Sequence, residues 1–330
     1  MKFLWLSLLV AFLFLLNLFI GSVYIPFGEV WKILGGEGGE VEKFIIIGNR
    51  LPSAVTALFA GSGLAVAGLL LQTAFRNPLA GPSILGITSG ASLGVAVVML
   101  FLGGTLSAGS LSVGDYTAVI IAAFVGSLAV MGLLIFLSSI LRNELMLLIT
   151  GIMIGYIVSS VITLLNSAST SESIRGYVYW GMGSFNGVAL NQLPLFCLIT
   201  LLGLFLAFLL MKPLDLLLLG QSYARNLGVN LTGVRNLLLL STGILTAVIT
   251  AYCGPISFLG LAVPHIARLF FPTDNHRILL PATCLTGAAI ALGCLIICVL
   301  PSSSIIPLNA VTPLIGAPVV IWVIFKRRGK

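Results

Sequence analysis

The stretch LPSAVTALFAGSGLAVAGLLLQTA, residues 51–74, carries no charged side chain. A helix of about 20 apolar residues crosses the ~30 Å hydrocarbon core of a bilayer, so this stretch predicts a membrane-spanning helix. Similar runs recur along all 330 residues, of which 59% are hydrophobic and 8% are charged. Because about a quarter of the residues in a soluble domain are charged, we interpret the chain as an all-α polytopic membrane protein.

The other apolar runs set the number of helices. Together they predict ten transmembrane helices, at residues 3–23, 50–74, 84–103, 116–140, 145–168, 192–211, 235–253, 256–271, 279–300 and 309–325. The apolar part of the first run, Phe3 to Ile20, is longer than that of a signal peptide, and no A-x-A cleavage site follows it. We therefore expect an uncleaved first span and a single transmembrane domain over residues 1–330.

The basic residues test the topology of these spans. With the N-terminus in the cytoplasm, ten spans return the C-terminus there, and twelve basic residues face inward: Lys2, Arg76, Arg142, Lys212, Arg225, Arg235, Arg268, Arg277, Lys326, Arg327, Arg328 and Lys330. The four that face outward are Lys32, Lys43, Arg50 and Arg175. Lysine and arginine are enriched in cytoplasmic loops, so both termini are expected in the cytoplasm. The net charge of +7 then reports topology and gives no indication of nucleic-acid binding.

Two patterns indicate how the helices pack. Small residues at helical spacing favour close helix approach, although glycine is also common in membrane helices generally; they are Ala57 and Gly61, Gly90 and Gly94, and Gly151 and Gly155. GPSILGI (81–87) and GPISFLGL (254–261) precede the third and eighth spans, at corresponding positions of two five-helix halves. This echo predicts an inverted-topology repeat, with a chance match as the alternative.

Several residues that would power or catalyse a reaction are missing. No Asp or Glu lies near the middle of a predicted span, where ion-coupled carriers usually have one. Backbone carbonyls can bind sodium, so an ion-coupled secondary transporter stays open as the alternative. The sequence has no G-x-x-x-x-G-K-[ST] phosphate loop, no HExxH motif and no CxxC pair. We therefore expect no enzyme activity, metal or cofactor in this chain, but a conduit whose energy source is another polypeptide.

Ordered motifs carry a resemblance to a known family. RNPLAGPSILGITSGA, residues 76–91, resembles the RNPLA-x-P-x-x-LG-x-x-x-GA signature of the FecCD/BtuC permease family. Further matches are RLP (50–52), YWGMGSFNG (179–187), ARNLGVN (224–230), GPISFLGLAVPHIARL (254–269) and LIGAP (314–318). The resemblance therefore covers nearly the whole chain.

The resemblance implies a function and an assembly. Members of this family are permease subunits of ABC importers in the cell inner membrane. They carry iron–siderophores, haem or cobalamin (vitamin B12), of which we expect an iron–siderophore first. The resemblance further implies a homodimer with the path at its interface, two cytoplasmic ABC ATPase subunits, and a periplasmic or lipid-anchored substrate-binding protein. ATP and Mg would bind the partner ATPase, and transport would follow alternating access.

The loop LGQSYARNLGVNLTGVRN, residues 219–236, lies in the expected ATPase-coupling segment, about 212–235. Tyr223 and Leu227 are four residues apart, which favours a short amphipathic helix. Gly228 suits the end of this helix, and Asn230 the start of the next. By resemblance, the residues that contact the ATPase are Gly220, Gln221, Ala224, Arg225, Leu227, Gly228 and Val229.

The remaining candidate residues lie at both ends of the spans. Arg50 begins the second span and, by resemblance, is expected to dock the binding protein, although Ser53 replaces a second arginine and the 301–308 loop is uncharged. Candidates for the gate or path are Arg76 and Asn77, also expected to cap a helix, and Tyr179, Trp180 and Gly183. Tyr179 and Trp180 suit interfacial anchors equally well. His265 and Arg268, three residues apart, are expected to have structural or interface roles.

Overall fold

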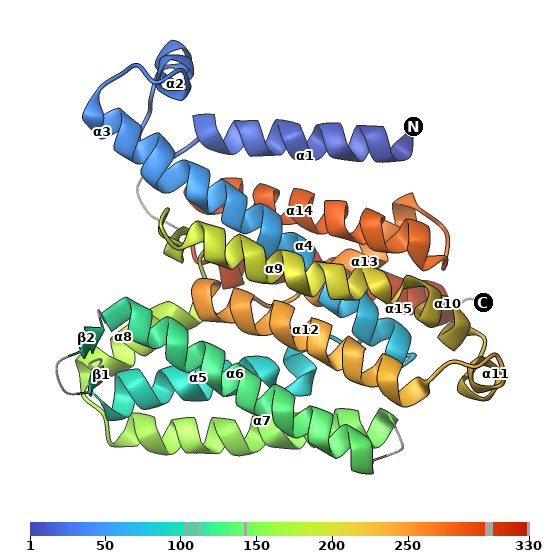
Figure 1. Cartoon of the computed structure of the whole chain (residues 1–330). Helices are drawn as coiled ribbons and strands as arrows, with labels where there is room; N and C mark the ends of the chain where they lie inside the picture. Colours follow the sequence, from blue (N-terminus) through green and yellow to red (C-terminus); the bar gives the residue numbers. More distant parts are fainter. Residues whose placement is uncertain (103–105, 109–110, 114, 142–143, 301–305, 329–330) are drawn as a thin grey trace.

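The computed structural model describes residues 1–102, 106–108, 111–113, 115–141, 144–300 and 306–328. Its long helices lie side by side in one bundle (Figure 1). Helices long and apolar enough to cross a membrane are α1 (Lys2–Phe19), the continuous stretch Glu40–Ala74, α6 (Asp115–Ile140), α7 (Glu144–Ser167), α12 (Leu231–Cys253) and α14 (His276–Val299). A pair bent by 46°, α9 (Leu193–Leu209) and α10 (Met211–Leu218), also qualifies as one span.

Three further apolar helical stretches complete the set. They are Ile87–Phe101, formed by α5 (Ile87–Ala96) and the π-helical η3 (Val97–Phe101), then α13 (Leu259–Phe270), and the apolar part Leu308–Val323 of α15 (Leu308–Arg328). Each of the ten predicted spans coincides with one of these elements in the part of the chain that the structure describes. The prediction of an all-α polytopic membrane protein is therefore confirmed.

Several predicted boundaries were wrong. The second span begins at Glu40, because α3 (Glu40–Lys43) and the π-helical η1 (Phe44–Arg50) continue into α4 (Leu51–Ala74) without a break. The first span ends at Phe19, and α12 begins at Leu231 instead of residue 235 because Asn230 caps it. Small elements that the hydrophobic runs do not reveal are α2 (Phe27–Leu34), η2 (Pro82–Leu85), η4 (Phe185–Gly187) and the antiparallel strands β1 (Leu106–Ala108) and β2 (Leu111–Val113).

The two ends of the bundle carry different elements. Figure 1 shows both chain termini at the same end as α10 and α11 (Gln221–Asn226). The opposite end carries α2, α3, α8 (Ser171–Gly181) and the β1–β2 pair. An arrangement of this kind agrees with an even number of spans. The assignment of the α10–α11 end to the cytoplasm stays a prediction from charge.

Small residues allow the helices to approach one another closely. A Cβ on Gly61 would lie 2.3 Å from the carbonyl O of Gly287, so α4 and α14 touch backbone to backbone. The same is true of α5 and α6, where a Cβ on Gly94 would lie 2.0 Å from the carbonyl O of Ala122. Both contacts involve small residues that the sequence pattern indicated, as expected for helices that associate without a hydrophobic driving force.

The two echoing segments have matching local structure. Gly86, at φ +76°, precedes α5, and Phe258, at φ +66°, precedes α13, so each short helix follows a left-handed residue. The segments also meet, because a Cβ on Gly260 would lie 2.7 Å from Cδ of Pro82. A cavity of about 230 Å³ lies between them. An irregular turn followed by a short helix, present twice and in contact, is typical of the discontinuous helices of transporters. The inverted repeat itself stays a prediction.

Candidate functional site

The candidate coupling end is formed by α10, α11 and the first turn of α12. The chain turns at Gly220, with φ +116°, and at Gly228, with φ +82°, conformations that favour glycine. The Oδ1 of Asn230 accepts from the N–H of Gly233 at 3.0 Å and so caps α12. The short helix, its end at Gly228 and the cap at Asn230 were predicted from local sequence, whereas the turn at Gly220 and the helix α10 were not.

The helix α11 displays apolar side chains on its outside. Ala224 is fully buried, whereas Tyr223 is 56% and Leu227 is 53% exposed. Exposed large apolar side chains on an otherwise polar loop indicate a contact surface. Leu227 was among the predicted contact residues, and Tyr223 joins it on the structure.

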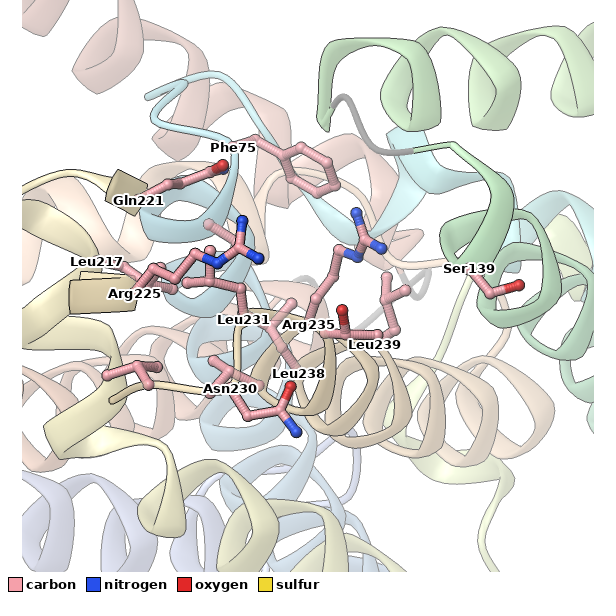
Figure 2. A pocket seen from close by; sticks show the side chains of 14 residues that line it. Phe75, Ser139, Leu217, Gln221, Arg225, Asn230, Leu231, Arg235, Leu238 and Leu239 are labelled. Atoms are coloured by element: carbon pink, nitrogen blue, oxygen red, sulfur yellow. The ribbon is translucent and has the colours of Figure 1, made fainter. Parts of the chain in front are cut away.

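A cavity of about 630 Å³ lies between α11 and the beginning of α12. Figure 2 shows Arg225 and Arg235 reaching toward the same space, with the ring of Phe75 beside them. Arg235 also donates to the carbonyl oxygens of Ser138 and, at 3.2 Å, Leu141, at the end of α6. The lining contains no acidic residue; its other members are Ala74, Ser139, Leu217, Gln221, Val229, Asn230, Leu231, Thr232, Val234, Leu238 and Leu239.

Hydrogen bonds between Asp215 and His276 fasten α10 to the rest of the bundle. The Oδ1 of Asp215 lies 2.6 Å from Nδ1 of His276 and accepts from its backbone N–H at 2.8 Å. The Nε2 of the same ring lies 2.9 Å from Oγ1 of Thr73, and the imidazole is 1% exposed. The link therefore joins α10, α14 and the end of α4. Sequence reasoning missed it, since no motif relates positions so far apart in the chain.

Arg76 and Asn77 lie at the same end as the coupling helix, but neither caps the helix that precedes it. The guanidinium of Arg76 donates to the carbonyl O of Leu217 at 2.9 Å, so it caps α10 instead of α4. The Oδ1 of Asn77 accepts from the N–H of Leu79 at 2.9 Å and closes a local turn. The expectation that both cap a helix is therefore borne out for Arg76, at α10, and not for Asn77; neither reaches back to α4, because the chain reverses directly after Phe75, with Arg76 at φ +45°.

His265 and Arg268 tie α13 to the end of α4 and to the segment that follows it. The Nε2 of His265 donates to the carbonyl O of Pro78 at 2.8 Å, and the guanidinium of Arg268 donates to Oε1 of Gln72 at 3.1 Å. Arg268 also lies 3.9 Å from the carboxylate of Asp274. These contacts are structural, and the described residues contain no group of three or more His, Cys, Asp or Glu side chains placed to hold a metal ion.

Arg50 lies at the opposite end of the bundle, and its side chain is buried. It is 8% exposed, and its guanidinium donates to the carbonyl oxygens of Leu18 at 2.9 Å, Phe19 at 3.0 Å and Val23. In this arrangement the side chain caps the end of α1 and is not displayed to a docking protein. Residues 301–305 of the uncharged loop lie outside the described residues.

The predicted gate segment forms the helix α8, followed by Gly183 at φ +71°. Tyr179 is 71% exposed, whereas Trp180 packs against Tyr177 with ring centroids 6.2 Å apart. Asn309, which sequence reasoning missed, ties this helix to α15. Its Nδ2 donates to the carbonyl O of Gly181 at 2.9 Å, and its Oδ1 accepts from the N–H of Ser257 at 3.0 Å.

Comparisons with known proteins agree with this architecture. The model of the FecCD transport family matches residues 8–326. The vitamin B12 import system permease protein BtuC of Klebsiella pneumoniae subsp. pneumoniae is 37% identical, over 98% of this chain and 93% of that protein. The protein of the same name from Salmonella newport is 36% identical, over 97% and 94%.

Two solved structures have a similar fold. A chain from an inward-facing metal-chelate type ABC transporter superposes with a TM-score of 0.84 at 31% identity, covering 97% of each chain. A chain of PsaBC from Streptococcus pneumoniae, solved with a Fab, gives a TM-score of 0.51 at 13% identity, covering 82% of this chain and 89% of that one. The second is a similarity of fold alone.

Proposed function

Since this chain belongs to the FecCD transport family, we propose that it is the permease subunit of an ABC importer that carries a metal chelate across the inner membrane. The single observation that supports this most strongly is the match to a metal-chelate type ABC transporter over 97% of both chains. An iron–siderophore is the cargo expected from the sequence. Because two relatives are named vitamin B12 import permeases, vitamin B12 is to be tested alongside it, with haem next.

The energy would come from two cytoplasmic ATPase subunits that bind Mg and ATP. We assign residues 1–330 to a single transmembrane domain whose coupling segment is about 212–235. The support is the exposed apolar surface of α11, formed by Tyr223 and Leu227, together with the basic cavity beside it. Gly220 and Gly228, both at positive φ, delimit α11 as a separate unit, which would suit a groove on the partner ATPase.

The importer would be a homodimer, with the path between the subunits. Only 22% of the most apolar window of α7 is buried in the protomer, and its exposed surface includes Ser159, Ser160 and Thr163. Small and hydroxyl-bearing residues are enriched where membrane helices pack against one another. A second subunit that covers this surface would leave them beside the path.

Co-expression with the neighbouring genes tests the proposal. An ATPase and a binding protein should co-purify with the chain, and the binding protein should select one chelate from a panel of iron–siderophores, haem and vitamin B12. The substitution Gly228→Val should leave the dimer intact and abolish ATP-dependent uptake, because it strains the turn that ends α11. If no ATPase co-purifies and uptake follows an ion gradient, the chain is an ion-coupled secondary transporter instead.

A further inference from the structure

The cavity between the two echoing segments is bordered by the N-termini of two helices. Thr88, the second residue of α5, and Gly260, the second residue of α13, both line it. The 10 residues of α5 and the 5 of η3 together span about 22 Å, and the 12 of α13 span about 18 Å. Neither length crosses the ~30 Å hydrocarbon core, so one end of each helix lies within the membrane.

The ends that lie within the membrane are the N-termini. The stretch η3 leads to the β1–β2 pair at one end of the bundle (Figure 1). At the other end, the carbonyl O of Phe270, the last residue of α13, accepts from Nζ of Lys2 at 2.9 Å. Each helix therefore reaches an end of the bundle with its C-terminus, and the two N-termini meet at depth beside the cavity.

Both N-termini place positive charge at the cavity. The N-cap residues, Gly86 and Phe258, provide no side-chain cap. The first backbone N–H groups of a helix have no partner within that helix, and the helix dipole adds partial positive charge there. Irregular backbone at membrane depth is tolerated only where it is buried in protein or lines a water-filled cavity. Two uncapped N-termini at one cavity therefore favour an oxygen acceptor that carries negative charge.

The hydroxyl of Thr250 is an independent sign of a ligand. This residue of α12 lines the cavity and is 2% exposed, and its Oγ1 has no hydrogen-bond partner in the part of the chain that the structure describes. By contrast, Thr246, one turn earlier on the same helix, donates to the carbonyl O of Thr242 at 2.7 Å. Threonine in a helix usually satisfies its hydroxyl in this way. Thr250 instead leaves a hydrogen-bond donor at the cavity.

The volume and position of the cavity limit what it can hold. About 230 Å³ corresponds to roughly eight water molecules at ~30 Å³ each. A pocket for a drug-sized ligand has about 300–1,000 Å³, so this cavity suits one arm of a chelate and not a whole chelate. Ser83 lines the cavity and is exposed, so the cavity reaches the protomer surface there. A Cβ on Gly86 would lie 2.8 Å from the carbonyl O of Gly151, which places this segment against α7, the helix that we assign to the path.

We propose that this cavity binds an anionic oxygen group, a carboxylate or a phosphate, of the chelate in transit. The inference rests on the proposed function and deepens it, since it names the part of the cargo that the permease itself recognises. The positive ends of α5 and α13 would stabilise the charge, and the hydroxyl of Thr250 would donate one hydrogen bond to it. Half-helix N-termini point at anionic substrate groups in the same way in other transporters built from discontinuous helices.

Binding of radiolabelled inorganic phosphate to the chain in nanodiscs tests the site itself. Thr250→Val removes the hydroxyl at nearly constant shape and should weaken phosphate binding about tenfold, as should Thr250→Ala. Thr250→Ser keeps the hydroxyl and should keep the affinity. Thr246→Val is the matched control, because Thr246 is buried on the same helix but does not line the cavity. It should leave phosphate binding unchanged.

Uptake by the complete transporter in proteoliposomes distinguishes the chelate from a free anion. The probe is whichever of haem, vitamin B12 and the iron–siderophores the binding protein selects. Thr250→Val should lower the maximal uptake rate about tenfold without loss of the ATPase, and Thr250→Ser should restore it. Added inorganic phosphate should slow uptake by the unaltered transporter more than uptake by Thr250→Val.

Each contrary outcome has its own meaning. If Thr250→Val and Thr250→Ala bind phosphate as tightly as the unaltered chain does, the inference is overturned while the permease function stands. If phosphate binding falls but chelate uptake does not, the cavity holds a free anion and the assignment to the cargo is wrong. A selected chelate with neither a carboxylate nor a phosphate overturns the inference as well. If the unaltered complex takes up no chelate, the proposed function itself fails, whatever the phosphate result.

Discussion

Asp215 provides the sharpest test of how the coupling segment is fastened to the bundle. Replacing it with alanine removes the acceptor for two hydrogen bonds from His276, at 2.6 and 2.8 Å. The imidazole, 1% exposed, would then keep only its contact with Thr73. The substitution should leave α10 attached through the bond from Arg76 to Leu217.

The expected cost follows from the geometry. A hydrogen bond to a charged group contributes about 1.5–3 kcal/mol to stability, and removing the acceptor also leaves the buried donor unsatisfied. The Asp215 side chain is 31% exposed, so water screens part of the interaction. For the two bonds together we expect roughly 3 kcal/mol. In a chain of this size that corresponds to a fall in Tm on the order of 5 °C.

Thermal unfolding in detergent measures the effect, and Asp274→Ala is the control. The Asp274 side chain is 80% exposed and 3.9 Å from Arg268, so its loss should change stability by at most ~0.5 kcal/mol. Asp215→Ala should also lower the number of chelates transported per ATP, because α10 joins the coupling helix to α14. Equal melting temperatures for the two variants would refute the reasoning.

Three further substitutions test separate parts of the structure. Gly68→Ala places a Cβ 1.7 Å from the carbonyl O of Gly260, so it should lower the free energy of unfolding by about 1–3 kcal/mol. Gly293→Ala, with open space around the glycine, should leave the free energy of unfolding unchanged, and thermal unfolding measures both variants. Arg50→Gln should lower the Tm because carbonyls at the end of α1 lose their donors; a loss of binding-protein affinity with unchanged Tm would instead point to docking. Leu227→Ala should leave the Tm within about 1 °C and weaken ATPase binding about tenfold, and unchanged binding would exclude α11 from the interface.

Local chemistry made much of this structure predictable. Apolar runs reveal helices because the bilayer demands a minimum length, and the turn at Gly228 and the cap at Asn230 depend only on neighbouring residues. The short helix α11 was predictable in the same way, from the four-residue spacing of Tyr223 and Leu227.

Long-range contacts were not predictable from the sequence. The partners of Asp215 and Arg50 are set by which helices pack together, and neither hydropathy nor spacing encodes that. The family resemblance suggested that Arg50 docks the binding protein, whereas its buried side chain binds the end of α1. Asn309 was missed for the same reason, because its partners lie in α8 and in the segment before α13.

Uptake into proteoliposomes tests the central claim most directly. The chain, its co-purifying ATPase and the binding protein loaded with its radiolabelled chelate are reconstituted with ATP and Mg on the side of α11. We predict uptake that requires ATP hydrolysis, persists when ion gradients are dissipated and is lost with Gly228→Val. Uptake that proceeds without the ATPase and collapses with the ion gradient would contradict the account.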